Sequence, residues 1–438
     1  MGMDILVLDH HEADKISEHA CIINNQLSPN YPNKDFSGVG ITYKFCKYYD
    51  KVYGYNYADK YIDLVALGNI SDMMNVTSLE THYYIQRGLL QIYNPFFAAM
   101  VEKQAYSLGD ELNPIGIAFY ITPYINATIR SGTQEDKKLL FESMLDLEAQ
   151  QLIPSTKRGH EMGEQETLVT QVVRNCTNIK RHQDDEKKML SEQIKEEILE
   201  NNLETNQIIF VKLQKPINKN LVGLLANQIM SEFQKPTIIL NKSEIDGKLY
   251  WQGSARNIGH TDLRLKDFMN DSQLVDYAEG HQSAFGLSIP DTNFINIIQY
   301  SNEKLADYDF TACYKVDKIY DYKDITSKDI FDIGALNAYY GQGFEEPYIA
   351  IENIPIGDNI TLMSPDKRPT INIQGANGIN YIKFKSSEEE MLRLKPLNPL
   401  QVNYINIVGR CNINYWNGNY TAQILVEEYE IKSSRYNF

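Results

Sequence analysis

The chain has 438 residues, of which 43% are hydrophobic and 23% are charged, values that are ordinary for a folded protein of two or three domains. The net charge of −16 argues against a broad cationic surface that coats duplex DNA, but it does not exclude a local groove or an acidic metal site. The five cysteines form no CxxC pair and no apolar run approaches about 18 residues, so we expect a cytoplasmic protein without a thiolate metal site or a membrane span.

The first predicted element is a strand. The apolar run from Ile5 to Leu8 has the length and composition of a strand that is buried on both faces. Asp9, His10 and His11 follow it directly. Ligands of α/β sheets bind at the carboxyl ends of strands, so this triplet would hold a metal ion and a phosphate there. The alternative is an ordinary strand end with polar residues in solvent.

Two further segments belong to the same region. Residues 37–45 begin Ser-Gly-Val-Gly, which predicts a tight turn that enters a helix. The apolar stretch of residues 61–72 ends in Asp72, which would lie near the two histidines. The alternative for Asp72 is a surface carboxylate at the start of a helix.

In order and spacing, these three segments resemble the DHH phosphoesterase superfamily, and within it the RecJ single-strand exonucleases. A further match runs from Pro123 to Arg130, where the family tends to read P-R-x-N-A-x-G-R. Asn126 and Arg130 keep that pattern. Tyr124 and Ile129 depart from it, which removes one possible phosphate contact and changes the turn.

Residues 134–205 are expected to form a helical connector. Leu190, Ile194 and Ile198 recur on one face of its second half, and charged residues occupy the other positions.

A second α/β unit is predicted next, with strands near residues 208–213 and 236–240 and a helix between them. Two glycine-containing motifs, at residues 253–257 and 280–286, resemble those of the DHHA1 domain. Ser254 and Arg256 are two residues apart on an extended strand and therefore share a face, so both would grip one phosphate. The alternative for Arg256 is a surface ion pair.

The rest of the chain is predicted to be an all-β module. Residues 339–348 resemble the turn that opens the OB-fold domain of RecJ proteins, and residues 409–430 resemble its closing strands around a hairpin turn. An OB-fold groove stacks bases on aromatic rings. Candidates for such stacking are Tyr339, Tyr340, Tyr415, Trp416 and Tyr420, although each ring equally suits a β-core.

The resemblance implies a metal site and roles for individual residues. The superfamily binds two divalent ions, usually Mn²⁺, with Mg²⁺ as the other expected ion. By resemblance, His10 and Asp72 would be ligands of one ion, His11 would contact the scissile phosphate and Asp9 would hold the cluster together. Arg130 is a further catalytic candidate. The candidates for contacts with phosphate or DNA are Asn126, Ser254, Arg256, His281 and Trp416.

The family's remaining metal ligands lie on motifs that should precede the Asp-His-His triplet, and this sequence does not contain them. We therefore expect a missing N-terminal segment or a second polypeptide to complete both the metal site and the parallel sheet.

The sequence thus predicts an α/β plus all-β protein. The expected domains are part of a DHH domain (1–133), the helical connector (134–205), a DHHA1 domain (206–290) and an OB-fold-like domain (291–438). The expected function is metal-dependent 5′→3′ hydrolysis of single-stranded DNA. The alternatives are a DHH phosphodiesterase for oligonucleotides or cyclic dinucleotides, and a non-catalytic DNA-binding or regulatory protein.

Overall fold

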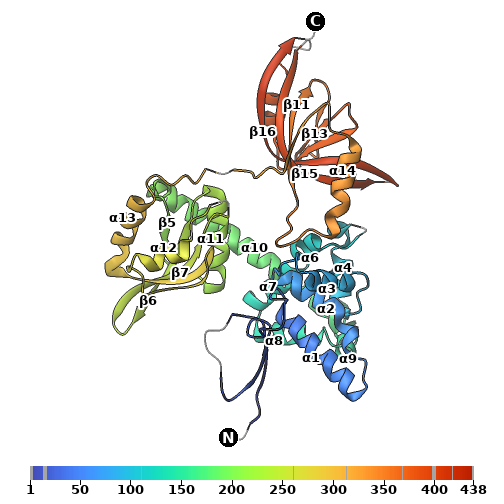
Figure 1. Ribbon diagram of the computed structural model, residues 1–438, viewed down its shortest axis with the longest axis vertical. Coiled ribbons are helices and arrows are strands. Elements are labelled where there is room, and N and C mark those ends of the chain that lie inside the picture. The colour runs from blue at the N-terminus through green and yellow to red at the C-terminus, as the bar shows by residue number, and fades with distance from the viewer. Residues whose placement is uncertain are drawn as a thin grey trace. The chain divides into compact units, whose positions relative to one another are not determined.

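The computed structural model describes residues 3–12, 17–109, 111–259, 261–311, 313–366, 368–396, 401–416 and 418–436, with the backbone alone at 401, 416 and 433–436. The chain folds into two compact units, shown in Figure 1. The terminal unit combines Met1–Pro123, Phe141–Val173 and Tyr314–Phe438, and the central unit combines Tyr124–Leu140 and Arg174–Cys313. Within the described ranges, no helix has both the length and the apolar character needed to span a membrane.

A pair of parallel strands opens the terminal unit. β1 (Leu6–Asp9) pairs with β2 (Cys21–Asn24), which confirms the predicted strand. The expected burial on both faces is wrong, because Ile5 and Leu6 are 48% and 46% exposed. Among the described residues β2 is the only strand that pairs with β1, so apolar surface that parallel sheets normally cover stays open.

Helices make up most of the remaining first segment. α1 (Gly38–Tyr53) begins at the predicted glycine turn, where the Ser37 side chain accepts a hydrogen bond from the Gly40 N–H. α2 (Ile62–Ser71) ends directly before Asp72, so that carboxylate follows the end of a helix and not its start. The other helices of this segment are η1 (Ala58–Tyr61), α3 (Leu79–Leu89), α4 (Pro95–Lys103), α5 (Ala105–Leu108) and α6 (Pro114–Tyr120).

The predicted connector is helical with one interruption. It contains α8 (Gln134–Glu142), α9 (Asp146–Ala149), the hairpin of β3 (Leu152–Pro154) and β4 (Gln165–Thr167), α10 (Leu168–Glu200) and η2 (Leu203–Thr205). Three helices, α7 (Thr122–Ser131), α8 and α10, have residues in both units. The predicted apolar face of α10 is confirmed, because Ile194 and Ile198 are buried and Leu190 packs against the same core.

The central unit is a five-stranded sheet covered on both faces (Figure 1). Its strands are β5 (Ile209–Lys212), β6 (Thr237–Ile245), β7 (Lys248–Arg256), β8 (Tyr277–His281) and β9 (Ala284–Pro290), in the order β5-β6-β7-β9-β8. Its other elements are α11 (Lys219–Phe233), α12 (Leu265–Asp271), η3 (Asp291–Asn293) and α13 (Phe294–Lys304).

Side chains alternate across this sheet as the pleat requires. Ile209 and Val211 face the core made with α10 and α11, whereas Ile208 and Phe210 face the core made with α12 and α13. Because Phe294 and Ile297 of α13 belong to that second core, the central unit extends past residue 290, the predicted end of its domain.

The rest of the terminal unit is a seven-stranded sheet whose core consists mainly of isoleucines. The strands are β10 (Lys318–Asp321), β11 (Tyr348–Ile356), β12 (Ile360–Met363), β13 (Thr370–Gln374), β14 (Ile379–Lys383), β15 (Gln401–Trp416) and β16 (Asn419–Tyr436). Their order is β10-β11-β15-β16-β14-β13-β12, with the predicted hairpin between β15 and β16. This sheet fits the predicted C-terminal β module, and three short helical elements accompany it: α14 (Ser327–Gly334), η4 (Ala335–Ala338) and α15 (Glu388–Leu394).

Candidate metal and phosphate sites

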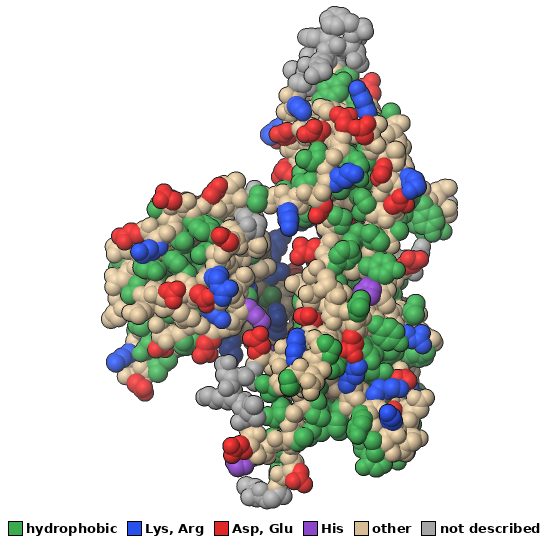
Figure 2. Space-filling model, viewed as in Figure 1, with side chains coloured by type: hydrophobic (Ala, Val, Ile, Leu, Met, Phe, Trp, Pro, Cys, Tyr) green, Lys and Arg blue, Asp and Glu red, His purple; other side chains and the backbone are tan. Residues whose placement is uncertain are grey.

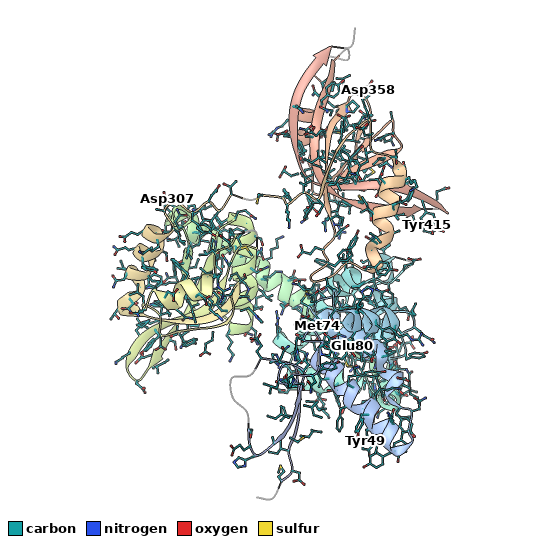
Figure 3. All side chains as sticks on the ribbon, viewed as in Figure 1. Tyr49, Met74, Glu80, Asp307, Asp358 and Tyr415 are labelled. Carbon is teal, nitrogen blue, oxygen red and sulfur yellow. The ribbon has the colours of Figure 1, made fainter. Side chains whose placement is uncertain are left out.

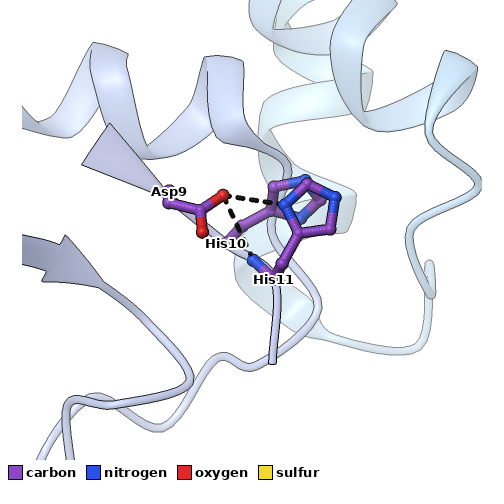
Figure 4. Close-up of side chains that lie close together, drawn as sticks. All are labelled: Asp9, His10 and His11. Atoms are coloured by element: carbon purple, nitrogen blue, oxygen red, sulfur yellow. Dashed lines mark hydrogen bonds and ion pairs between the residues drawn. The ribbon is translucent and has the colours of Figure 1, made fainter. Parts of the chain in front are cut away.

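The Asp-His-His triplet lies at the carboxyl end of β1, as predicted. Asp9 is the last residue of β1, and its Oδ1 lies 2.8 Å from His11 Nδ1 and accepts a 3.4 Å hydrogen bond from the His11 N–H (Figure 4). The side chain of Asn24, the last residue of β2, donates to the His11 carbonyl at 2.9 Å and holds the chain as it leaves the strand. One potential ligand atom from each of Asp9, His10 and His11 lies within 4.8 Å of the others.

Asp72 joins this cluster through His10. His10 Nε2 lies 3.0 Å from Asp72 Oδ2, and the His10 side chain is only 14% exposed whereas that of Asp72 is 47% exposed. The structure therefore brings together the two residues that the sequence analysis named as ligands of one ion.

A close contact between α1 and α2 sets this geometry. Asn69 is fully buried in the last turn of α2, and its Oδ1 accepts a 3.0 Å hydrogen bond from the Ser37 N–H at the start of α1. Gly68 allows the approach, because a Cβ there would lie 2.8 Å from the Val39 Cβ. Gly38 lies against His10, since a Cβ on it would be 3.4 Å from the His10 Cδ2. One helix junction therefore positions both His10 and Asp72.

The electrostatics of the triplet favour an ionised carboxylate. The hydrogen bond from the His11 side chain lowers the pKa of Asp9 from its usual value, and hydrogen bonds from the backbone N–H groups of His10 and His11 act in the same direction. An ionised carboxylate beside two imidazoles is a set of oxygen and nitrogen donors that suits Mn²⁺ or a similar divalent ion.

The donors fit such an ion but supply only part of its ligands. Asp9, His10, His11 and Asp72 are four potential ligating side chains, fewer than a pair of ions needs. The described ranges contain no other group of three or more His, Cys, Asp or Glu residues arranged to hold a metal.

A second cluster lies wholly within the central unit. Ser254 and Arg256 lie on β7, and both approach Gly223 of α11: a Cβ on this glycine would be 3.5 Å from Ser254 Oγ and 2.6 Å from Arg256 Nη2. This confirms that the two side chains share a face of the strand. Burial, and secondly the charge of Arg130, lower the pKa of the Arg256 guanidinium.

The surroundings of Arg256 do not match the alternative of a surface ion pair. Arg256 is half-buried, and the only hydrogen bond that its side chain forms within the described part of the chain is the one that it donates to the Ala255 carbonyl at 2.7 Å. Neither Arg256 nor Arg130 forms an ion pair within the described ranges. Two neighbouring guanidinium groups without a carboxylate can bind an anion, because the anion relieves their repulsion.

The remaining predicted residues have different surroundings. Asn126 lies half-buried in α7, in the same unit as Arg130 and Arg256. His281 is exposed at the end of β8. Trp416 ends β15, and its side chain lies outside the described residues. Of the stacking candidates, Tyr340 is 2% exposed and belongs to the protein interior.

The roles of Gly223 and Asn69 were not predicted from the sequence. A glycine inside an amphipathic helix is the available signal for the first, because such a glycine often marks a close approach. Nothing local distinguishes Asn69, since its partner Ser37 lies 32 residues earlier in the chain.

Comparison with known proteins identifies similar chains. The RecJ OB domain family matches residues 316–428. The chain is 33% identical to the SPbeta prophage-derived protein YorK of Bacillus subtilis (strain 168), named as a single-strand DNA-specific exonuclease, over 98% of this chain and 74% of YorK. It is 23% identical to the single-stranded-DNA-specific exonuclease RecJ of the same organism, over 98% of this chain and 51% of RecJ.

A solved structure has the same fold. The crystal structure of RecJ from Thermus thermophilus in complex with Mn²⁺ matches 99% of this chain and 59% of that chain with a TM-score of 0.70, at 16% identity. The chain thus spans about half the length of the RecJ relatives it matches.

The helix junction gives a first prediction. Replacing Asn69 by Ala leaves the buried N–H of Ser37 without its acceptor, which should lower the free energy of unfolding by about 1–3 kcal/mol. Asn56→Ala is the matched control, because Asn56 is exposed and has no side-chain hydrogen bond within the described ranges. Urea unfolding of both variants measures the difference, and equal stability would show that the junction does not depend on this bond.

Proposed function

This chain belongs to the RecJ family of single-strand DNA-specific exonucleases, and from that premise we propose that it hydrolyses phosphodiester bonds of single-stranded DNA in the 5′→3′ direction. The observation that carries the proposal is the placement of His10 against Asp72 beside Asp9 and His11. Relatives that match this chain along nearly all of its length are named as single-strand DNA-specific exonucleases, which supports the substrate and the type of reaction.

We assign the metal-binding role to His10 and Asp72. A bound divalent ion supplies positive charge that stabilises the developing negative charge on a phosphodiester. His10 is largely buried, and its Cδ2 would lie 3.4 Å from a Cβ placed on Gly38, so its imidazole is held in place before any ion binds. Asp72 is more exposed and faces the same position from the end of α2.

Asp9 and His11 serve the substrate side of the site in this proposal. The Asp9 carboxylate fixes the His11 ring through Nδ1, which leaves Nε2 available to contact a phosphate oxygen. The His11 side chain is 75% exposed, so a DNA phosphate can reach it.

We further propose that another segment or polypeptide completes the metal site. Two features support this: four potential ligands fall short of what two ions need, and the apolar residues Ile5 and Leu6 of the β1 region lie exposed. A strand added alongside β1 would cover that apolar surface and could carry further carboxylates to the ends of the strands.

The central unit supplies the phosphate anchor in our proposal. Arg256 would bind two oxygens of a terminal phosphate, Ser254 would donate its hydroxyl to it, and Arg130 would balance the remaining charge. Gly223 leaves room for the Arg256 guanidinium, because a Cβ at this position would overlap with it.

The activity is tested with protein purified from its own cells together with any chain that accompanies it. With Mn²⁺, it should shorten a labelled single-stranded oligonucleotide and leave the duplex intact. His10→Asn should reduce the rate of hydrolysis at least about 100-fold. Removal of a residue that only hydrogen-bonds to a metal ligand already lowers activity by up to about this factor, and removal of the ligand itself should lower it no less. The control is His19→Asn, since His19 is exposed and outside the cluster.

Other outcomes of this assay would contradict the proposal. Hydrolysis confined to dinucleotides would indicate a small-substrate phosphodiesterase. Binding of single strands without hydrolysis, in the presence of Mn²⁺ and any accompanying chain, would indicate a non-catalytic protein.

The phosphate anchor gives a separate prediction. Wild-type protein should bind a 5′-phosphorylated oligonucleotide about tenfold or more tightly than its 5′-hydroxyl form, as a charge-assisted hydrogen bond contributes about 1.5–3 kcal/mol. Arg256→Gln should abolish this preference, and Gly223→Ala should weaken it because the new methyl displaces the guanidinium.

The matched control for the anchor is Arg264→Gln, because Arg264 is exposed in the same unit and pairs with Asp267. Fluorescence anisotropy measures both affinities in EDTA, where the oligonucleotides stay intact. A preference for the 5′ phosphate that survives Arg256→Gln would place the anchor elsewhere.

A further inference from the structure

Six exposed tyrosines gather at the carboxyl end of α1 and in the segment that follows it. We call them the tyrosine patch; they are Tyr48, Tyr49, Tyr53, Tyr55, Tyr57 and Tyr61. Their side chains are between 42% and 67% exposed. Figure 3 labels Tyr49 at the far end of α1, and Figure 2 shows hydrophobic side chains gathered over this end of the helix with basic side chains among them.

Four rings of the patch, those of Tyr49, Tyr53, Tyr55 and Tyr57, lie close enough to form a continuous aromatic surface. The ring centroids of Tyr49 and Tyr53 are 4.4 Å apart, and those of Tyr55 and Tyr57 are 5.6 Å apart. Tyr53 and Tyr55 are nearly parallel, with 23° between their planes and 6.5 Å between their centroids. Consecutive flat faces of this kind are what a stacking platform for bases requires.

The backbone holds these rings in place without burying them. Gly54 ends α1 in the left-handed conformation with a φ of 75°. The Asp50 carboxylate then accepts hydrogen bonds from the N–H groups of Tyr57 and Ala58 at 2.7 and 2.8 Å. The turn that carries the rings is therefore fixed before any partner binds, which lowers the entropy cost of binding.

The hydroxyl groups of the patch have no partner in the described part of the chain. None of the six hydroxyl groups forms a hydrogen bond within the described residues, whereas the nearby Tyr43 hydroxyl bonds to Asp59 at 2.7 Å. Six exposed aromatic side chains gathered at one place on a folded protein mark a surface that contacts a partner.

The charge around the patch favours an anionic partner. Residues 47–61 contain three lysines and two aspartates, in a chain whose net charge is −16. Both aspartates are engaged, Asp50 with backbone N–H groups and Asp59 with Lys47 and Tyr43. Lys51 and Lys60 form no ion pair within the described ranges, and the Lys60 Nζ lies 5.8 Å from the Tyr57 ring centroid. Flat apolar faces beside available lysines match the bases and phosphates of a single strand.

We propose that the tyrosine patch is a second binding surface for single-stranded nucleic acid, on which bases stack at a distance from the site of hydrolysis. The proposal rests on the proposed function, which makes a single strand the substrate. α1 begins beside His10 and is about 24 Å long at 1.5 Å per residue, so a strand must be several nucleotides long to reach both places.

The test compares two substrates and one triple variant. Tyr49→Ser, Tyr53→Ser and Tyr55→Ser together should weaken binding of a labelled 30-nucleotide single strand roughly 10- to 100-fold in EDTA, since each stacked ring contributes to affinity. The triple variant should hydrolyse a dinucleotide with Mn²⁺ at the wild-type rate, because a dinucleotide is too short to reach the patch from the site of hydrolysis. Replacing the same three residues by Phe should restore binding, as the stacking faces return.

The control is Tyr106→Ser, because Tyr106 is fully exposed in the same unit and belongs to no ring cluster. The slope of affinity against salt should change little in the triple Ser variant, since the rings and not the phosphate contacts have been removed.

Two results would overturn the proposal. One is an affinity for the long strand that is the same in the triple Ser variant and in wild type. The other is a wild-type self-association in sedimentation that the triple Ser variant loses while its DNA affinity stays intact, which would make the patch a contact between copies of this chain. Binding is measured without hydrolysis, so the binding result can be interpreted even if the protein hydrolyses no DNA. If the patch does not bind DNA, the hydrolytic activity is unaffected.

Discussion

The candidate metal site depends on the junction between the start of α1 and the end of α2. The Asn69 amide oxygen accepts the Ser37 N–H, and Gly68 admits Val39 at a distance that a Cβ would not allow. This contact holds the backbone that lies against His10 and also fixes the helix end from which Asp72 projects. His10 and Asp72 are far apart in the sequence, and a short strand alone could not bring them together. The packing of α1 against α2 positions both residues.

The two functional clusters belong to different compact units. His10, Asp72 and their neighbours lie in the terminal unit, whereas Arg130, Ser254 and Arg256 lie in the central unit. The sequence analysis grouped Arg130 with the catalytic residues because it matches the family motif at residues 123–130, inside the predicted first domain (1–133). The structure places it beside Arg256, because α7 crosses from one unit into the other. Our assignment of Arg130 to the phosphate anchor follows from this neighbour.

Local patterns predicted those elements whose cause is local. The strand before Asp9, the glycine turn that begins α1, the apolar face of α10 and the shared face of Ser254 and Arg256 each follow from the composition or periodicity of a short stretch of chain. The helix α13 was not predicted, because the residues after about 290 were assigned to the β module. The spacing of its apolar residues nevertheless puts Phe294 and Ile297 on one buried face. The roles of Gly223 and Asn69 depend on partners that are distant in the sequence. The exposure of the tyrosine patch depends on how the rest of the chain packs around α1. The glycine within an amphipathic helix is a local signal for a close approach at Gly223, but it does not name the partner, and Asn69 and the tyrosine patch have no local signal.

The most direct test of this account is the affinity of the protein for Mn²⁺, measured by electron paramagnetic resonance on the wild type and on His10→Asn and Asp72→Asn. The account predicts that the wild type binds Mn²⁺ with coupling to imidazole nitrogen, and that each variant binds it at least about tenfold more weakly. Mn²⁺ binding that both variants retain at full strength would contradict the assignment of His10 and Asp72 as ligands.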